Sequence, residues 1–99
     1  MMLLTKEIRK RLPPIKSQEN VEDPIVQVKF FHPFYSWTWY AIEFDGEDEF
    51  FGYVVGHEKE LGYFSLAELK SINIHGLGME RDYYFKPCRL SEIKPTEDK

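Results

Sequence analysis

The chain has 99 residues, of which 42% are hydrophobic and 30% charged, and its net charge is −4. This length allows one domain with one core, so we expect a single domain over residues 1–99 and exclude a second. No apolar run approaches the ~20 residues that a membrane-spanning helix needs, which excludes an integral membrane protein. The single cysteine and the lack of a signal-peptide pattern favour a cytoplasmic location.

Residues 1–14 predict a short N-terminal helix. Thr5 is a suitable N-cap, and Leu4, Ile8 and Leu12 recur every four residues, which places them on one helical face. Pro13-Pro14 ends the helix, because the residue before a proline disfavours helical backbone angles.

The same segment is rich in positive charge. Residues 1–16 carry five cations and one acid, whereas the rest of the chain is acidic. Binding to nucleic acid needs clustered cations that contact phosphates. This function therefore stays open through four residues of the predicted helix: Lys6, Arg9, Lys10 and Arg11.

Residues 25–64 predict an antiparallel β-meander, because they alternate β-branched and aromatic residues with short turns. We expect strands at 25–32, 37–44 and 50–55, and a very short strand at 62–64 after a polar connector. In the first strand Val26, Val28 and Phe30 are expected to face the core.

The central hairpin has the sequence WTWYAIEFDGEDEFF, residues 37–51. Its Asp45-Gly46 pair suggests a two-residue turn. That register would place Glu43 opposite Asp48, and like charges directly opposite are unfavourable. We therefore predict a four-residue loop over residues 45–48.

This register gives the hairpin two unequal faces. The face that we expect to join the core carries Thr38, Tyr40, Ile42 and Phe44 against Phe51, Tyr53 and Val55. The other face carries Trp37, Trp39 and Ala41 against Gly52 and Val54, so a large ring lies beside two small positions. We predict a ligand or partner site on this second face.

The C-terminal third predicts a helix and a last strand. Ser65 and Glu68 have the spacing of a capping box, which predicts a helix over residues 65–72. Residues 72–79 read as a loop, 82–87 as the last strand, and 90–93 as a helical turn. The fold class is α+β: a small antiparallel β-meander of four to five strands with two short helices packed on it.

The candidate binding residues are aromatic and charged side chains of the hairpin and the later loops. They are Trp37, Trp39, Tyr40, Glu43, Asp45, Glu58 and Arg81. Aromatic rings side by side could form an interface or a stacking platform, and Arg81 could hold an anion or orient the last strand through an ion pair. Core packing and solvated turn acids are the structural alternatives.

Catalysis is the less favoured reading. A metal-dependent hydrolase or nuclease would need the oxygens of Glu43, Asp45 and Glu58 to converge on one ion, with Arg81 stabilising an anion. The three histidines lie on separate loops, and no zinc, nucleophile or phosphate-binding motif occurs. We therefore expect no catalytic residue, no metal site and no cofactor.

Several stretches together resemble a known family. WTWY, EFDGED, FFG, EKELGYFSL and ERD, with LLTKEIRKRLPP and DPIVQVKFF, are similar to a family of small bacterial proteins of unknown function. Members of that family are often encoded on plasmids, phages and integrative conjugative elements. The resemblance implies an accessory role on mobile genetic elements but supplies no activity, and this chain departs from the pattern mainly at HPFYS and INIHGLG.

These observations favour a protein-interaction module that binds another protein, or a second copy of itself, through the central hairpin. A metal-dependent hydrolase or nuclease and a nucleic-acid-binding protein remain the alternatives, and no membrane partner is expected.

Overall fold

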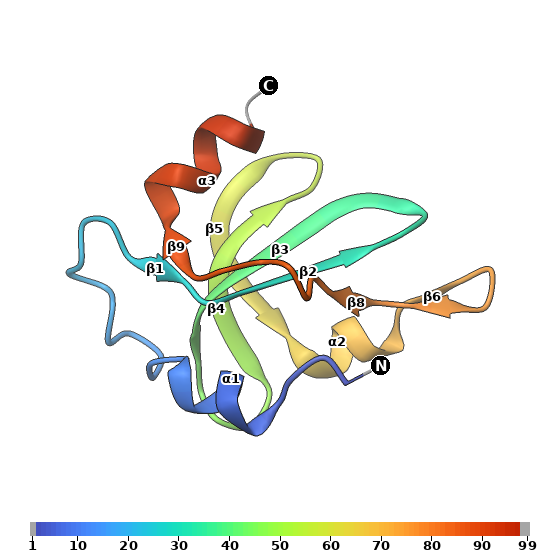
Figure 1. Cartoon of the computed structure of the whole chain (residues 1–99), viewed down its shortest axis with the longest axis horizontal. Coiled ribbons are helices and arrows are strands. Elements are labelled where there is room, and N and C mark those ends of the chain that lie inside the picture. The colour runs from blue at the N-terminus through green and yellow to red at the C-terminus, as the bar shows by residue number, and fades with distance from the viewer. Residues whose placement is uncertain (1, 98–99) are drawn as a thin grey trace.

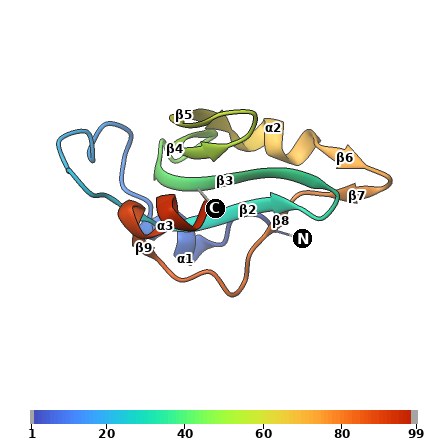
Figure 2. The ribbon, with the colours of Figure 1, turned by 90° about the horizontal axis from the view of Figure 1, so that it is seen from above.

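A curved, five-stranded antiparallel sheet forms the centre of the protein, with strand order β5-β4-β3-β2-β8 (Figure 1). The computed structural model describes residues 2–97; Met1 and residues 98–99 of the expected domain lie outside the described residues. Helices and loops cover both faces of the sheet (Figure 2). The predicted α+β class is confirmed.

The elements are short. The helices are α1 (Lys6–Arg11), α2 (Leu66–Ser71) and α3 (Leu90–Glu97). The strands of the main sheet are β2 (Val28–His32), β3 (Tyr35–Phe44), β4 (Glu49–Val55), β5 (Lys59–Ser65) and β8 (Glu80–Arg81). Two small sheets pair β1 (Ile25–Val26) with β9 (Cys88–Arg89), and β6 (Asn73–Ile74) with β7 (Leu77–Gly78). The sequence indicated only a helical turn where α3 lies.

Both predicted helix caps are present. The Thr5 hydroxyl accepts a hydrogen bond from Ile8 N–H, and the Ser65 hydroxyl accepts one from Glu68 N–H, each at 3.2 Å. Asp48 adds a contact that the sequence did not predict: its carboxylate accepts from Ala67 N–H at 2.8 Å and from the Ser65 hydroxyl at 2.7 Å. The acidic loop between β3 and β4 therefore fastens the N-terminus of α2.

The predicted first strand, residues 25–32, is split in two. Gln27 separates β1 from β2, and its N–H donates to the carbonyl of Ala41 at 2.9 Å. Because β1 turns away to pair with β9, Val26 joins a different core cluster from Val28 and Phe30. All three are buried, as predicted.

We expected residues 56–62 to be a polar connector. They are instead the turn of the β4–β5 hairpin and the first half of β5. The Gly56 N–H donates to the carbonyl of Glu58 at 2.9 Å and closes a tight turn, so β5 begins at Lys59. The segment is polar because β5 is an edge strand that exposes its first residues to water. Polarity here marks an edge rather than a loop.

The predicted last strand over residues 82–87 is wrong. Strands β8 and β9 flank this segment, and the segment itself turns. The Asp82 carboxylate accepts from Tyr84 N–H at 2.9 Å, and the Asp82 carbonyl accepts from Phe85 N–H at 3.3 Å. An aspartate that bonds the backbone two residues on favours a turn over a strand, and Pro87 has no N–H to donate to a ladder.

The central hairpin follows the predicted register over most of its length. Tyr40 lies opposite Tyr53 and Ala41 opposite Gly52, as expected, and the loop spans residues 45–48. Between Ala41 and Glu43 the register shifts, so Ile42 does not pair with Phe51 as predicted. A β-bulge adds one residue to β3 here and bends the strand.

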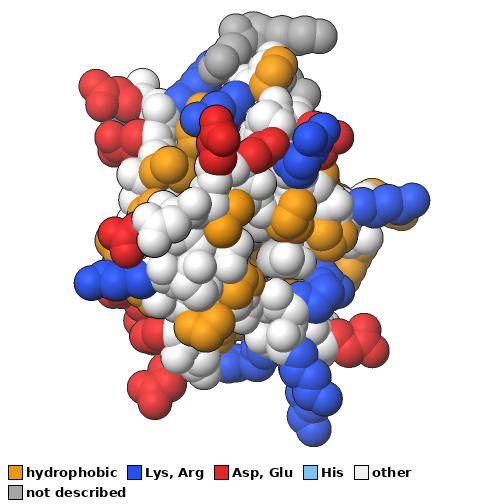
Figure 3. Space-filling view, turned by 90° about the vertical axis from the view of Figure 1, so that its left-hand side faces the viewer, with side chains coloured by type: hydrophobic (Ala, Val, Ile, Leu, Met, Phe, Trp, Pro, Cys, Tyr) orange, Lys and Arg blue, Asp and Glu red, His pale blue; other side chains and the backbone are white. Residues whose placement is uncertain are grey.

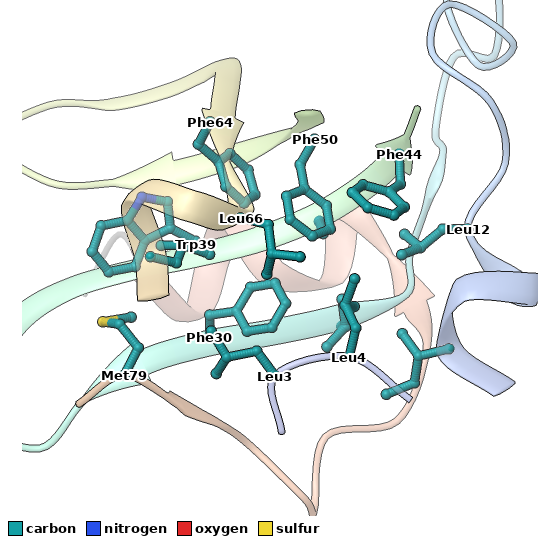
Figure 4. Close-up of a cluster of buried hydrophobic side chains, with 14 residues drawn as sticks. Leu3, Leu4, Leu12, Phe30, Trp39, Phe44, Phe50, Phe64, Leu66 and Met79 are labelled. Carbon is teal, nitrogen blue, oxygen red and sulfur yellow. The ribbon is translucent and has the colours of Figure 1, made fainter. Parts of the chain in front are cut away.

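The face on which we predicted a ligand or partner site carries the larger core. Trp39 and Ala41 pack there with Phe30, Phe44 and Phe50, beneath α1, α2 and the N-terminal segment (Figure 4). The ring of Phe50 stacks with the rings of Phe44 and Phe64, at centroid distances of 4.5 and 5.0 Å. This face is therefore packed core beneath helices and not an open site, so that part of the prediction is wrong.

The opposite face carries a smaller cluster. Tyr40, Ile42, Tyr53 and Val55 pack against residues of α3, including Leu90 and Ile93. The predicted core face is thus buried as well, but α3 is short and covers it only in part. The part of this face that α3 leaves uncovered contains the candidate site described below.

Candidate functional site

Of the three aromatic candidates, two belong to the core. Trp39 and Tyr40 are only 7% and 3% exposed, on opposite faces of β3. Trp37 is half-buried and lies flat over Gly56, where a Cβ would come within 2.6 Å of the indole ring. Tyr35 stacks on Trp37 at 6.0 Å with 15° between the ring planes. These rings run from the core to the end of the sheet rather than forming an open platform.

Glu43 has a structural role. Its carboxylate is 3% exposed and accepts hydrogen bonds from Lys16 N–H at 2.9 Å and Gln18 N–H at 2.7 Å. The loop after α1 is thereby fastened to the edge of the bulge in β3. A carboxylate held by two backbone donors is not a free ligand or base.

Asp45 caps the acidic turn. One carboxylate oxygen accepts from the N–H groups of Glu47, Asp48 and Glu49 at 2.8, 2.8 and 3.1 Å. These bonds, with those of Glu47 and Asp48 the strongest, hold the pKa of the Asp45 carboxyl below its ordinary value. Hydrogen bonds to the charged form favour it, which explains the direction.

Arg81 fastens the N-terminal segment. Its guanidinium donates to the carbonyls of Met2 at 2.8 Å and Leu3 at 3.2 Å, and lies 4.9 Å from the centre of the Tyr83 ring. Asp82, the next residue in the chain, forms an ion pair with Lys29 at 3.7 Å.

The structure does not bring the acidic candidates together. Glu43 lies opposite Phe51, whereas Glu58 lies in the turn beyond Val55, at least about 13 Å further along the sheet at ~3.3 Å per residue. Among the side chains that the structure describes, those of residues 2–95, no group of three or more His, Cys, Asp or Glu could hold a metal ion. The arrangement required for the metal-dependent hydrolase is therefore not formed.

A groove of about 300 Å³ lies on the smaller core's face, where sequence reasoning did not place a site. Its floor is the sheet, through Ile42, Phe51, Leu61 and Tyr63. The loop over residues 16–24 forms one wall and α3 the other, and β5 is the edge strand of its floor. Leu61 and Tyr63 are 46% and 54% exposed.

The outer edge of β5 offers free backbone groups. The Leu66 N–H donates to the Asp48 carbonyl at 2.8 Å at one end of the β4–β5 ladder, and Gly56 N–H to Glu58 at the other. Hydrogen-bonded pairs alternate along an antiparallel ladder, so even-numbered residues of β5 bond to β4. The N–H and C=O groups of Leu61 and Tyr63 therefore point outward, and no partner for them occurs among the described residues.

The exposed surface carries charge of both signs. Figure 3 shows hydrophobic side chains in separate patches among acidic and basic ones on the side that is at the left in Figure 1. The four cations of α1 do not share one face: Arg9 donates to the carbonyl of Gly46, and Arg11 to that of Gln27 on the other flank of the helix. None of the helices over residues 2–97 is long and apolar enough to cross a membrane.

Sequence reasoning missed the groove because its walls come from distant segments. The loop over residues 16–24 looked like an irregular connector, and α3 looked like a single turn. Leu61 and Tyr63 were the available signal, because two residues of a strand that are separated by one position share the same face.

One of three comparisons with known proteins found a match, to a family of unknown function. No curated protein and no solved structure is detectably similar to this chain. One family model, described as "Protein of unknown function (DUF2958)", matches residues 3–94. The chain therefore belongs to this uncharacterised family.

Proposed function

We propose that the protein is an interaction module that binds an extended segment of a partner protein along β5. The observation that carries the proposal is the free edge at Leu61 and Tyr63, whose backbone groups point outward and whose side chains are exposed beside the groove. A strand added to this edge would gain main-chain hydrogen bonds, and its side chains would supply the specificity.

The groove supports a partner other than a second copy. Its walls carry both cations, Lys16 and Lys94, and acids, Glu19 and Glu22, so a mixed polar segment with apolar residues would fit. Two β5 strands paired around Gly62 would bring only the odd-numbered residues of the second copy's β5 to this face. Such a pair would leave the groove itself empty.

Differential capture from the native host tests the proposal. In Leu61→Pro the ring removes an outward N–H without touching the β4–β5 ladder, as is tolerated on edge strands. Tyr63→Lys is a second variant, and Tyr84→Lys, at a residue 92% exposed and outside the groove, is the matched control. Wild type and the control should retain the same partner, and both edge variants should lose it.

Hydrogen exchange then locates the contact. The purified partner should slow exchange of the Leu61 and Tyr63 amides, because they become hydrogen-bonded. Equal capture by all variants, with no added protection at β5, would reject the proposal. A purified wild-type chain that dimerises, together with a monomeric Leu61→Pro variant, would instead identify a second copy as the occupant.

A cytoplasmic accessory role on a mobile genetic element is part of the same proposal. It is supported by the resemblance to proteins encoded on plasmids, phages and conjugative elements. The identities of neighbouring genes test it: chromosomal housekeeping neighbours throughout the family would count against it.

A further inference from the structure

A hollow of about 560 Å³ lies between α1 and α2, on the face of the larger core. Its floor is apolar and comes from Leu3, Leu4 and Leu66, and Met2, which is 68% exposed, also lines it. This volume falls within the range of about 300–1,000 Å³ that is usual for ligand sites. The hollow is separate from the groove beside β5, with which it shares no residue.

Three cations surround this floor. Lys6 and Arg9 come from α1, and Lys70 comes from the last turn of α2, about sixty positions along the chain. No carboxylate lines the hollow, and none of the three cations forms an ion pair with the described side chains, those of residues 2–95. In a chain with 17 acids and 13 cations, this is a local excess of positive charge that would attract anions.

Arg9 is held in place for this role. Its guanidinium donates to the Gly46 carbonyl at 3.2 Å and lies 5.4 Å from the centre of the Phe44 ring. A guanidinium has five N–H donors, and the Gly46 carbonyl occupies one of them. Because these two contacts restrict the side chain, binding an anion there requires less loss of conformational freedom.

We propose that the hollow binds single-stranded nucleic acid, with phosphates on the three cations and a base or sugar on the leucine floor. The combination of an apolar floor and a cationic rim favours this ligand over an acidic peptide, whose carboxylates would need the rim alone. A single strand fits because its bases are free to reach the floor, whereas a duplex keeps them stacked.

The cations that line the hollow differ from those that the sequence suggested for binding nucleic acid. Sequence reasoning grouped Lys6, Arg9, Lys10 and Arg11, but only the first two line the hollow. Arg11 lies on the other flank of α1, and Lys10 contributes no lining atom. Lys70 replaces them, and only the fold brings it there.

Fluorescence anisotropy with a short labelled oligothymidylate tests the proposal. Wild type should bind with an affinity that falls as salt is raised, because phosphate contacts release counterions. Lys70→Gln should weaken binding about fivefold, and Arg9→Gln should act in the same direction. Lys10→Gln, on the same helix and with the same loss of charge, should change the affinity less than about twofold.

Three results would overturn the proposal. They are no binding at low salt, equal weakening by Lys70→Gln and Lys10→Gln, and displacement of the oligonucleotide by poly-glutamate as readily as by unlabelled oligothymidylate. The last result would point to an acidic protein partner.

A duplex of the same length should bind more weakly than the single strand. Circular dichroism on each variant confirms that the fold is retained, and the Leu61→Pro variant should bind the oligonucleotide as wild type does.

Discussion

Gly52 lies so close to the backbone of Tyr40 that a Cβ at position 52 would come within 1.9 Å of the Tyr40 carbonyl oxygen. The two residues are on neighbouring strands, β4 and β3, next to the bulge that bends β3. A close approach of two backbones requires glycine, since any side chain would force the strands apart. Glycine at position 52 therefore allows β3 and β4 to lie this close together beside the bulge.

Gly52→Ala should therefore destabilise the protein by about 3 kcal/mol, because the clash is with backbone that cannot move aside cheaply. The matched control is Gly62→Ala, at the residue paired with Gly52 on β5, where a Cβ would meet nothing within 4 Å. The control should change stability by less than about 0.5 kcal/mol. Urea unfolding measures both, and similar values for the two variants would show that the strands do not approach this closely.

Glu43→Gln should destabilise the protein by about 1–3 kcal/mol. The amide offers one oxygen where the carboxylate offers two, so one of the partly buried N–H groups of Lys16 and Gln18 loses its acceptor. Glu47→Gln, an exposed substitution in the acidic turn, is the control and should have little effect. Thermal and urea unfolding give the difference. If Glu43 served only as a metal ligand and did not hold the loop after α1, the substitution would leave stability unchanged.

Acid should weaken the β3–β4 turn through Asp45. The ordinary pKa of this carboxyl is 3.8, and the N–H groups of Glu47 and Asp48 lower the pKa in the folded state. A lowered folded pKa means that the charged form stabilises the fold above about 3.8 and that this contribution is lost as the pH falls through the folded value. Stability should thus decline between about pH 5 and pH 2, and less steeply in Asp45→Asn.

The Asp45→Asn variant should still lose some stability as the pH falls. The Ser91 hydroxyl and N–H also lower the pKa of Asp23, which therefore adds its own acid dependence. Urea unfolding across this pH range gives the slope of the unfolding free energy against pH for each protein. Identical slopes for wild type and Asp45→Asn would show that the turn carboxylate is not held by the backbone N–H groups.

Local sequence patterns determined most of the elements. Thr5 and Ser65 each begin a helix, because a side-chain oxygen satisfies a free N–H within the same turn. The alternation of aromatic residues and the four-residue acidic loop set the register of the central hairpin from Thr38 to Ala41. These features depend on neighbours a few residues apart, so the sequence alone predicted them.

Contacts between distant residues decided the rest. Ile42 lies outside the predicted register, at a bulge beside Glu43, on which the loop after α1 docks. The Trp37 face became the core because the N-terminal segment, α1 and α2 cover it. The edge of β5 is open because β8 pairs with β2 at the other side of the sheet. Lys70 meets Lys6 and Arg9 only through the packing of α1 and α2 on one face. Hydrophobic pattern shows which positions become buried but not which segment covers them, and both candidate sites depend on that choice.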